Sequence, residues 1–162
     1  MRLYLVQHGT CVPKDENPER PLSQSGRDDI SRIASFLGRS RLPVARVFHS
    51  GKLRAQETAL LLSEVLGPGR VVEDCPCSIG PNDPTEELYG VIEAWPDGGM
   101  EGDVMIVGHL PYMSRLVSRL VTGDEDNVVV HFLPGTVVAV DRGDNGGGWS
   151  VSWVVRPELL GG

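Results

Sequence analysis

Short apolar runs alternate with segments of helical periodicity along this chain. The run Val104–Val107 has no polar residue at alternate positions, which is typical of a strand covered on both faces of a sheet. The segments between the runs carry apolar residues with the spacing of a helix that buries one face. This alternation predicts an α/β fold, a three-layer α/β/α sandwich with a mainly parallel central sheet.

The expected elements follow one another along the chain. Strands are expected over Leu3–Val6, Val44–His49, Arg70–Glu73, Asp103–Val107, Thr136–Asp141 and Trp149–Val155. Helices are expected over Ser23–Gly38, Leu53–Leu66 and Thr85–Trp95, and a fourth is expected to bury the stripe Met113, Leu116, Val117, Leu120 and Val121. Ser25 and Asp28 suit a capping box for the first helix, and Asp97-Gly98-Gly99 would end the third. The glycine-rich turn 143–148 predicts a terminal hairpin.

Length and charge narrow the class of protein. The 162 residues, 40% of them hydrophobic, are enough for one core, so we expect a single domain over residues 1–162. A formal net charge of −7 argues against a nucleic-acid-binding surface. The basic residues other than Lys14 and Lys52 are all arginines, the side chain suited to bidentate phosphate recognition. An acidic chain of this kind is compatible with a local cationic pocket.

The cysteines and the apolar runs predict a cellular setting. An odd number of cysteines, Cys11, Cys75 and Cys77, does not suit a disulfide framework and fits a reducing compartment. The Cys-Pro-Cys spacing has no second ligand pair nearby, so no metal site is expected. No secretory signal opens the sequence, and no apolar stretch approaches the roughly 20 residues of a membrane span. We therefore expect a cytoplasmic monomer with no membrane partner.

Two histidines follow predicted strands at matching positions. His8 comes after Leu3–Val6 and His109 after Asp103–Val107, each beside a glycine. Ligands of such sheets bind beyond the carboxyl ends of the strands. Either histidine alone would suit a strand end satisfied by backbone hydrogen bonds, whereas the matched pair favours a site. Arg54 falls near the start of a predicted helix, where a positive charge is unfavourable next to the helix dipole. Either an anion binds between the arginine and the helix N-terminus, or the side chain is an ordinary solvated arginine.

Five segments, in the same order along the chain, resemble the signature of the histidine phosphatase superfamily, which has the phosphoglycerate-mutase-like fold. They are Val6-Gln7-His8-Gly9-Thr10, Arg20-Pro21-Leu22-Ser23 with Gly26, Ser50-Gly51-Lys52-Leu53-Arg54-Ala55-Gln56-Glu57-Thr58-Ala59, Pro81-Asn82-Asp83-Pro84 and Val107-Gly108-His109-Leu110-Pro111. The fourth segment is similar to one in the branch of SixA-type phosphohistidine phosphatases. The resemblance extends over positions 1 to 122.

The resemblance implies a metal-independent phosphatase that needs no cofactor. It implies catalytic roles for His8, Arg54 and His109, with a covalent phosphohistidine at His8. The residues that the resemblance places at the phosphate are Gln7, Gly9, Arg20, Arg54, His109 and Leu110. This assignment suits the chemistry, because phosphoryl transfer needs positioning and positive charge, and a neutral imidazole is a competent nucleophile.

One position departs from the family pattern. Gln7 stands where the family has its first arginine, so one charge-assisted contact, worth about 1.5–3 kcal/mol, is replaced by an uncharged amide. Weakened catalysis, or a phospho-ligand binding module without turnover, is therefore one alternative.

The substrate expected from the resemblance is phosphohistidine on a phosphorelay-type partner protein. An imidazole leaving group, with a pKa of about 6.5, departs more readily than an alkoxide and needs less help from a general acid. The other alternative is a small-molecule phosphomonoesterase, whose general acid would be Asp83, Glu86 or Glu87. The chain is too short for a large lid insert, and an uncovered pocket suits a histidine displayed on another protein.

Overall fold

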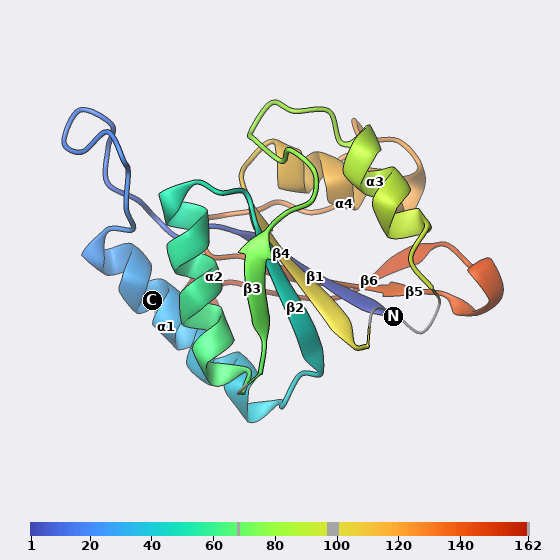
Figure 1. Cartoon of the computed structure of the whole chain (residues 1–162), viewed down its shortest axis with the longest axis horizontal. Helices are drawn as coiled ribbons and strands as arrows, with labels where there is room; N and C mark the ends of the chain where they lie inside the picture. Colours follow the sequence, from blue (N-terminus) through green and yellow to red (C-terminus); the bar gives the residue numbers. More distant parts are fainter. Residues whose placement is uncertain (68, 97–100, 162) are drawn as a thin grey trace.

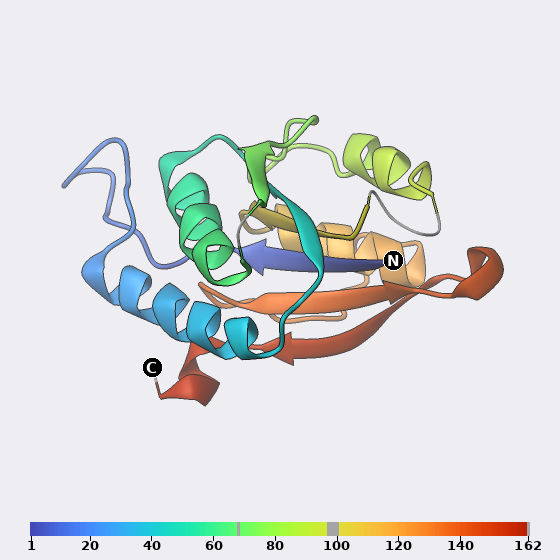
Figure 2. The ribbon, with the colours of Figure 1, turned by 60° about the horizontal axis from the view of Figure 1, so that its bottom comes forward.

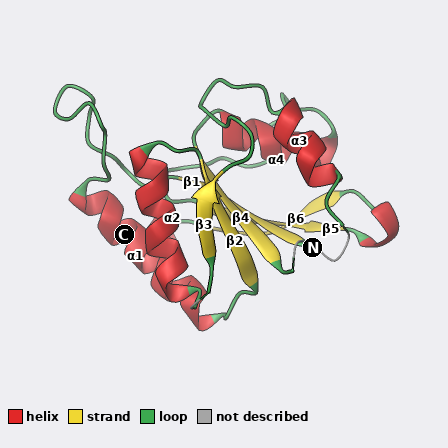
Figure 3. Ribbon diagram, viewed as in Figure 1, coloured by secondary structure: helices red, strands yellow, loops and turns green. Residues whose placement is uncertain are grey.

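A computed structural model describes residues 1–67, 69–96 and 101–161 of the chain. These residues contain one sheet with the strand order β3-β2-β4-β1-β5-β6 (Figures 1 and 3). The strands are β1 (Arg2–Gln7), β2 (Val44–His49), β3 (Val71–Asp74), β4 (Asp103–Gly108), β5 (Val137–Arg142) and β6 (Trp149–Val155). The α-helices are α1 (Gln24–Arg39), α2 (Leu53–Val65), α3 (Glu86–Glu93) and α4 (Tyr112–Thr122), and short 3-10 helices cover Asp144–Gly146 and Pro157–Leu160.

Helices cover both faces of the sheet, which confirms the predicted three-layer sandwich. Helices α1 and α2 lie side by side on one face, and α3 and α4 lie on the other (Figures 1 and 2). Successive residues of β1 point to opposite faces: Leu3 packs with the α3 and α4 side, and Tyr4 packs with the α1 and α2 side. Residues 104–107 of β4 are fully buried, as their uninterrupted apolar run predicts.

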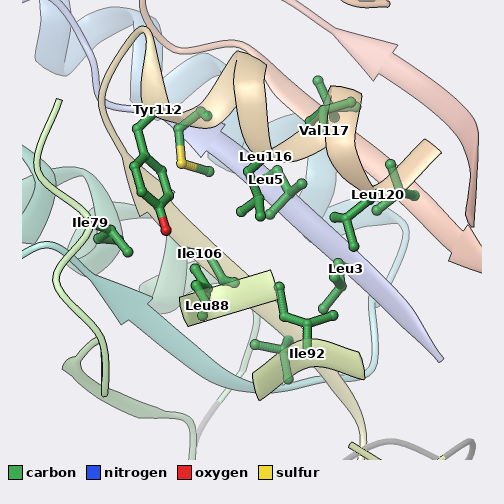
Figure 4. Close-up of a cluster of buried hydrophobic side chains, with 14 of the residues drawn as sticks. Leu3, Leu5, Ile79, Leu88, Ile92, Ile106, Tyr112, Leu116, Val117 and Leu120 are labelled. Atoms are coloured by element: carbon green, nitrogen blue, oxygen red, sulfur yellow. The ribbon is translucent and has the colours of Figure 1, made fainter. Parts of the chain in front are cut away.

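The core beneath α3 and α4 is built from both sheet and helix side chains. Figure 4 shows leucine and isoleucine side chains from β1, β4 and α3 meeting the apolar stripe of α4. The labelled residues are Leu3, Leu5, Ile79, Leu88, Ile92, Ile106, Tyr112, Leu116, Val117 and Leu120. Residues 116, 117 and 120 belong to the stripe predicted from helical spacing, so that stripe is core.

The sheet is parallel at its centre and antiparallel at one edge. Strand β4 pairs in parallel with β1 and with β2, and β2 pairs in parallel with β3. Strand β5 runs antiparallel to β1, and β6 runs antiparallel to β5, which confirms the predicted terminal hairpin. Because β4 lies between β1 and β2, the carboxyl ends of three parallel strands meet at one edge of the sheet.

The predicted start of the first helix is wrong in one respect. Ser23, rather than a box of Ser25 and Asp28, is the N-cap of α1, and its Oγ accepts a hydrogen bond from the Gly26 N–H at 3.1 Å. Ser23 holds this place because its hydroxyl also donates to the Thr10 carbonyl oxygen, which ties the cap to the preceding loop. Ser25 lies beside the Ser23 hydroxyl on the exposed side.

Other predicted boundaries of helices and strands differ from the observed ones by one or two residues, which is common at the ends of these elements. Strand β3 begins at Val71, one residue later than expected, and α3 is confined to Glu86–Glu93. The turn predicted at Asp97-Gly98-Gly99 lies outside the described residues. None of the helices in the described ranges is long and apolar enough to cross a membrane.

Candidate active site

The two histidines predicted at strand ends lie side by side. Strands β1 and β4 pair in register with Gln7 opposite Gly108, so the next residue of each strand is a histidine. The His8 N–H donates to the Gly108 carbonyl oxygen at 3.0 Å, and the ring centroids of His8 and His109 are 4.9 Å apart. Adjacent parallel strands therefore bring together two residues about a hundred positions apart in the sequence.

A backbone contact orients the His8 imidazole. Its Nδ1 lies 2.7 Å from the Gly9 carbonyl oxygen, which can only accept a hydrogen bond, so Nδ1 carries the proton. The lone pair is left on Nε2, and the Arg54 Nε–H donates to that atom at 3.3 Å. A Cβ on Gly9 would lie 2.9 Å from the Ile30 side chain, so the close packing beneath the histidine requires glycine.

Both site histidines are neutral at neutral pH. Burial lowers the pKa of His8 to about 4, and the nearby Arg54 and Arg20 charges add to the effect. Burial also lowers the pKa of His109 to about 3, with contributions from His8 and Arg54. A neutral His8 with its lone pair on Nε2 is in the form that a nucleophile needs.

Two arginines place positive charge at this edge of the sheet. Arg54 lies in the first turn of α2, whose N-cap residue, Lys52, makes no side-chain capping bond. Burial and the charge of Arg20 lower the pKa of Arg54. Arg20 reaches the site from the loop after β1, where its Nη2 lies 3.3 Å from the Cys11 Sγ and its backbone has a φ of 49°. Two cations held near one helix N-terminus favour a bound anion.

A buried threonine connects the loop after His8 to α2. The Thr58 Oγ1 accepts from the Gly9 N–H at 3.1 Å and donates to the Arg54 carbonyl oxygen at 2.7 Å. Glu57, one residue earlier, accepts from the Leu22 N–H at 2.7 Å and pairs with Arg27, and so ties α2 to the start of α1. Both residues lie in the segment 50–59 that resembles the family, but nothing in that sequence pattern indicates these contacts.

Gln7 and Leu110 flank the two histidines. The Gln7 side chain is 8% exposed, and its Oε1 has no hydrogen-bond partner in the described part of the chain. Gln7 immediately precedes His8 in the chain, and its side chain carries no charge. Leu110 is half-buried and packs against the core under α3 and α4.

The three carboxylates considered as general acids are not engaged with the histidines. Asp83 accepts hydrogen bonds from the Ser78 hydroxyl at 2.5 Å and the Gly80 N–H at 2.7 Å, and these contacts hold its pKa below the usual range. Glu86 and Glu87 are exposed in the first turn of α3. An ionised Asp83 held within its own loop is not in the protonated form that a general acid needs.

The cysteines are free thiols. Burial raises the pKa of Cys75 to about 11, so this thiol is protonated at neutral pH. Within residues 1–67, 69–96 and 101–161, no three His, Cys, Asp or Glu side chains are grouped as a metal ion would require.

Known proteins resemble this chain over nearly its full length. No protein-family model matches it. The phosphohistidine phosphatase SixA of Escherichia coli (strain K12) is 23% identical over 158 residues, which cover 97% of this chain and 94% of that protein. The structure of the protein histidine phosphatase SixA complexed with tungstate matches with a TM-score of 0.84 at 23% identity, covering 99% of both chains.

Another solved structure has the same fold. The structure of a mycobacterial glucosyl-3-phosphoglycerate phosphatase with VO3 matches with a TM-score of 0.67 at 17% identity, covering 94% of this chain and 97% of that one. Together these likenesses confirm the phosphoglycerate-mutase-like fold and the resemblance to the SixA branch of the histidine phosphatase superfamily.

Proposed function

We propose that this SixA-like chain is a phosphatase that removes the phosphoryl group from phosphohistidine on another protein, through a covalent intermediate on His8. One observation carries the proposal: the His8 Nδ1 is bonded to the Gly9 carbonyl oxygen, which leaves a neutral Nε2 facing Arg54. The curated relative named phosphohistidine phosphatase supports the same reaction class.

The proposed reaction has two displacements. In the first, the His8 Nε2 forms a bond to phosphorus as the bond to the substrate's imidazole nitrogen breaks, and the substrate ring, protonated on its other nitrogen, leaves as neutral imidazole. In the second, a water oxygen attacks phosphorus, the Nε2–P bond breaks, and phosphate leaves with both protons of that water. The enzyme returns to its starting form after each cycle.

Positive charge and positioning supply the catalysis. Arg54 and Arg20 would bind the phosphoryl oxygens, and His109 would lie beside them, with the backbone of Gly9 and the neighbours Gln7 and Leu110 completing the site. The guanidinium groups can balance the phosphoryl charge, so the proposed reaction is metal-independent.

The state of Asp83 bears on the substrate. An imidazole leaving group has a pKa of about 6.5 and needs little help from an acid, whereas an alkoxide needs a protonated group. Asp83 is held ionised by Ser78 and Gly80, which favours phosphohistidine over a phosphomonoester. We propose a phosphorelay-type protein as the partner and, from the three free cysteines, the cytoplasm as the compartment.

The test is transfer of label to His8. The protein is mixed with ³²P-labelled phosphohistidine protein and quenched within milliseconds in alkaline SDS, because an N–P bond is labile in acid. We expect acid-labile label on the wild type and on His131→Asn, a matched variant at an exposed histidine, and none on His8→Asn. Hydrolysis by His8→Asn at the wild-type rate would sink the proposal.

A second function, binding without turnover, is favoured by Gln7 alone. An uncharged amide at this buried position supplies less stabilisation to the transition state of phosphoryl transfer than the arginine of the family pattern would. Protection against thermal unfolding by phosphate, together with no hydrolysis of phosphohistidine or of sugar and nucleotide monophosphates, would identify a binding module.

A further inference from the structure

Ser50 makes a contact with the site that the proposed reaction does not use. Ser50 directly follows β2, and its Oγ lies 2.5 Å from the His109 Nε2. The same oxygen accepts from the Lys52 N–H at 3.4 Å. Strand β2 pairs with β4, with His49 opposite Val107. The pairing of the two strands therefore brings Ser50 and His109, which follow their ends, close together.

The other nitrogen of His109 has no partner. His109 is 1% exposed, and its Nδ1 makes no hydrogen bond with any described residue. A buried polar atom without a partner costs about 1–3 kcal/mol, so a folded protein seldom retains one without a use. The ring lies 4.9 Å from His8, centroid to centroid, so His109 borders the proposed phosphoryl group, and with Nε2 bonded to Ser50 only Nδ1 is left to contact it.

We infer that Ser50 is a positioning residue that fixes the tautomer of His109. The Ser50 hydroxyl donates its proton to Nε2, so His109 carries its own proton on Nδ1 and offers that N–H to the phosphoryl oxygens. The inference rests on the proposed function, and in it Ser50 acts only through His109.

The reverse hydrogen bond would not serve an anion. If His109 donated from Nε2 to Ser50, the Nδ1 lone pair would face the site, and a lone pair repels phosphoryl oxygens. A doubly protonated ring is also disfavoured, because burial together with the charges of Arg54, Lys52 and Arg20 lowers the pKa of His109. Without Ser50, a neutral His109 would divide between two tautomers, and one of them would not bind the ligand.

The matched variants are Ser50→Ala, which removes the hydroxyl, and Ser50→Thr, which keeps it. Ser63→Ala is the control for the same substitution at a half-buried serine on α2, whose hydroxyl donates to the Leu60 carbonyl oxygen. The probe for the site is inorganic vanadate, and its affinity is measured by calorimetry. The tautomer is measured by ¹⁵N NMR on protein labelled at histidine, with the His109 signals assigned through His109→Gln.

We expect the wild type to show a protonated Nδ1 and an unprotonated Nε2 on His109, both free and with vanadate. In Ser50→Ala the two tautomers should mix and vanadate should bind about two- to fivefold more weakly, because only the fraction protonated on Nδ1 is competent, while Ser50→Thr and Ser63→Ala stay near the wild type. A wild-type His109 protonated on Nε2, or unchanged vanadate affinity in Ser50→Ala, would overturn the inference.

Neither measurement requires turnover, so the two proposals can fail separately. Weak vanadate binding by Ser50→Ala, with no label on His8 in the wild type, would refute only the phosphatase. Label on His8 that forms in Ser50→Ala at the wild-type rate would refute only the role of Ser50.

Discussion

Thr58→Val tests whether one buried hydroxyl holds the proposed nucleophile in place. Thr58 is fully buried and joins the Gly9 N–H to the Arg54 carbonyl oxygen. Valine has nearly the same shape but neither donates nor accepts. The substitution therefore leaves the Gly9 N–H without its acceptor while changing the packed volume very little.

The expected loss follows from those two bonds. Leaving the Gly9 N–H unpaired in a buried position costs about 1–3 kcal/mol, and loss of the bond to the Arg54 carbonyl adds about 1 kcal/mol. A total of about 2–4 kcal/mol corresponds to a fall in Tm of roughly 5–15 °C for a domain of this size. Because the Gly9 carbonyl oxygen orients the His8 ring, we also expect kcat for phosphohistidine to fall by about tenfold or more.

The assay pairs urea unfolding with single-turnover transfer to His8. Thr58→Ser is the matched control, since it keeps the hydroxyl and loses one methyl group, worth about 1 kcal/mol. We expect Thr58→Val to be less stable and slower than Thr58→Ser. A Thr58→Val protein as stable as the wild type, with the same transfer rate as Thr58→Ser, would refute the reasoning.

Two further predictions concern charge in the site. Gln7→Arg should tighten vanadate binding by about tenfold or more, through one charge-assisted contact, which calorimetry measures. It should also lower the stability of the unliganded protein, measured by thermal unfolding, because it adds a third arginine near Arg54 and Arg20. Unchanged vanadate affinity would contradict the prediction. The free energy of unfolding should also fall as pH drops from about 6.5 toward 4. In the unfolded chain His8 takes up a proton in this range, whereas in the folded protein, where its pKa is about 4, it does not. The stability lost through His8 is on the order of 3 kcal/mol once the pH is below 4. Urea unfolding at several pH values should show a shallower decline for His8→Asn, and parallel curves for the variant and the wild type would contradict this cause.

The fold was predictable because its signals are local. The uninterrupted apolar run of β4 and the stripe of α4 each indicate both the type of element and its buried face. The cap of α1 was mispredicted because Ser23 is selected by a contact with Thr10 in a preceding loop, which helical spacing does not reveal. Helix ends depend on such tertiary contacts more than helix interiors do.

The arrangement of the candidate site was predictable only in part, for a related reason. The positions of His8 and His109 after strands are visible in the sequence, but their adjacency depends on β4 lying between β1 and β2. The contacts of Thr58 and Ser50 require that strand order and the distances it creates. Residues that support others, rather than carry a recognisable chemistry themselves, leave little trace in a single sequence.

The strand order has a consequence for how the protein can be made and dissected. Strands β1 and β2 come early in the chain, and β4, which separates them in the sheet, comes much later. Long-range pairing of this kind slows folding, because distant segments must meet before either is stabilised. A chain emerging from the ribosome therefore carries His8 and Arg54 long before β4 can place His109 beside them, and we expect no fragment that stops before Asp103 to have the proposed activity. Co-expression of two fragments, divided between β3 and β4, should restore the proposed activity that neither fragment has alone.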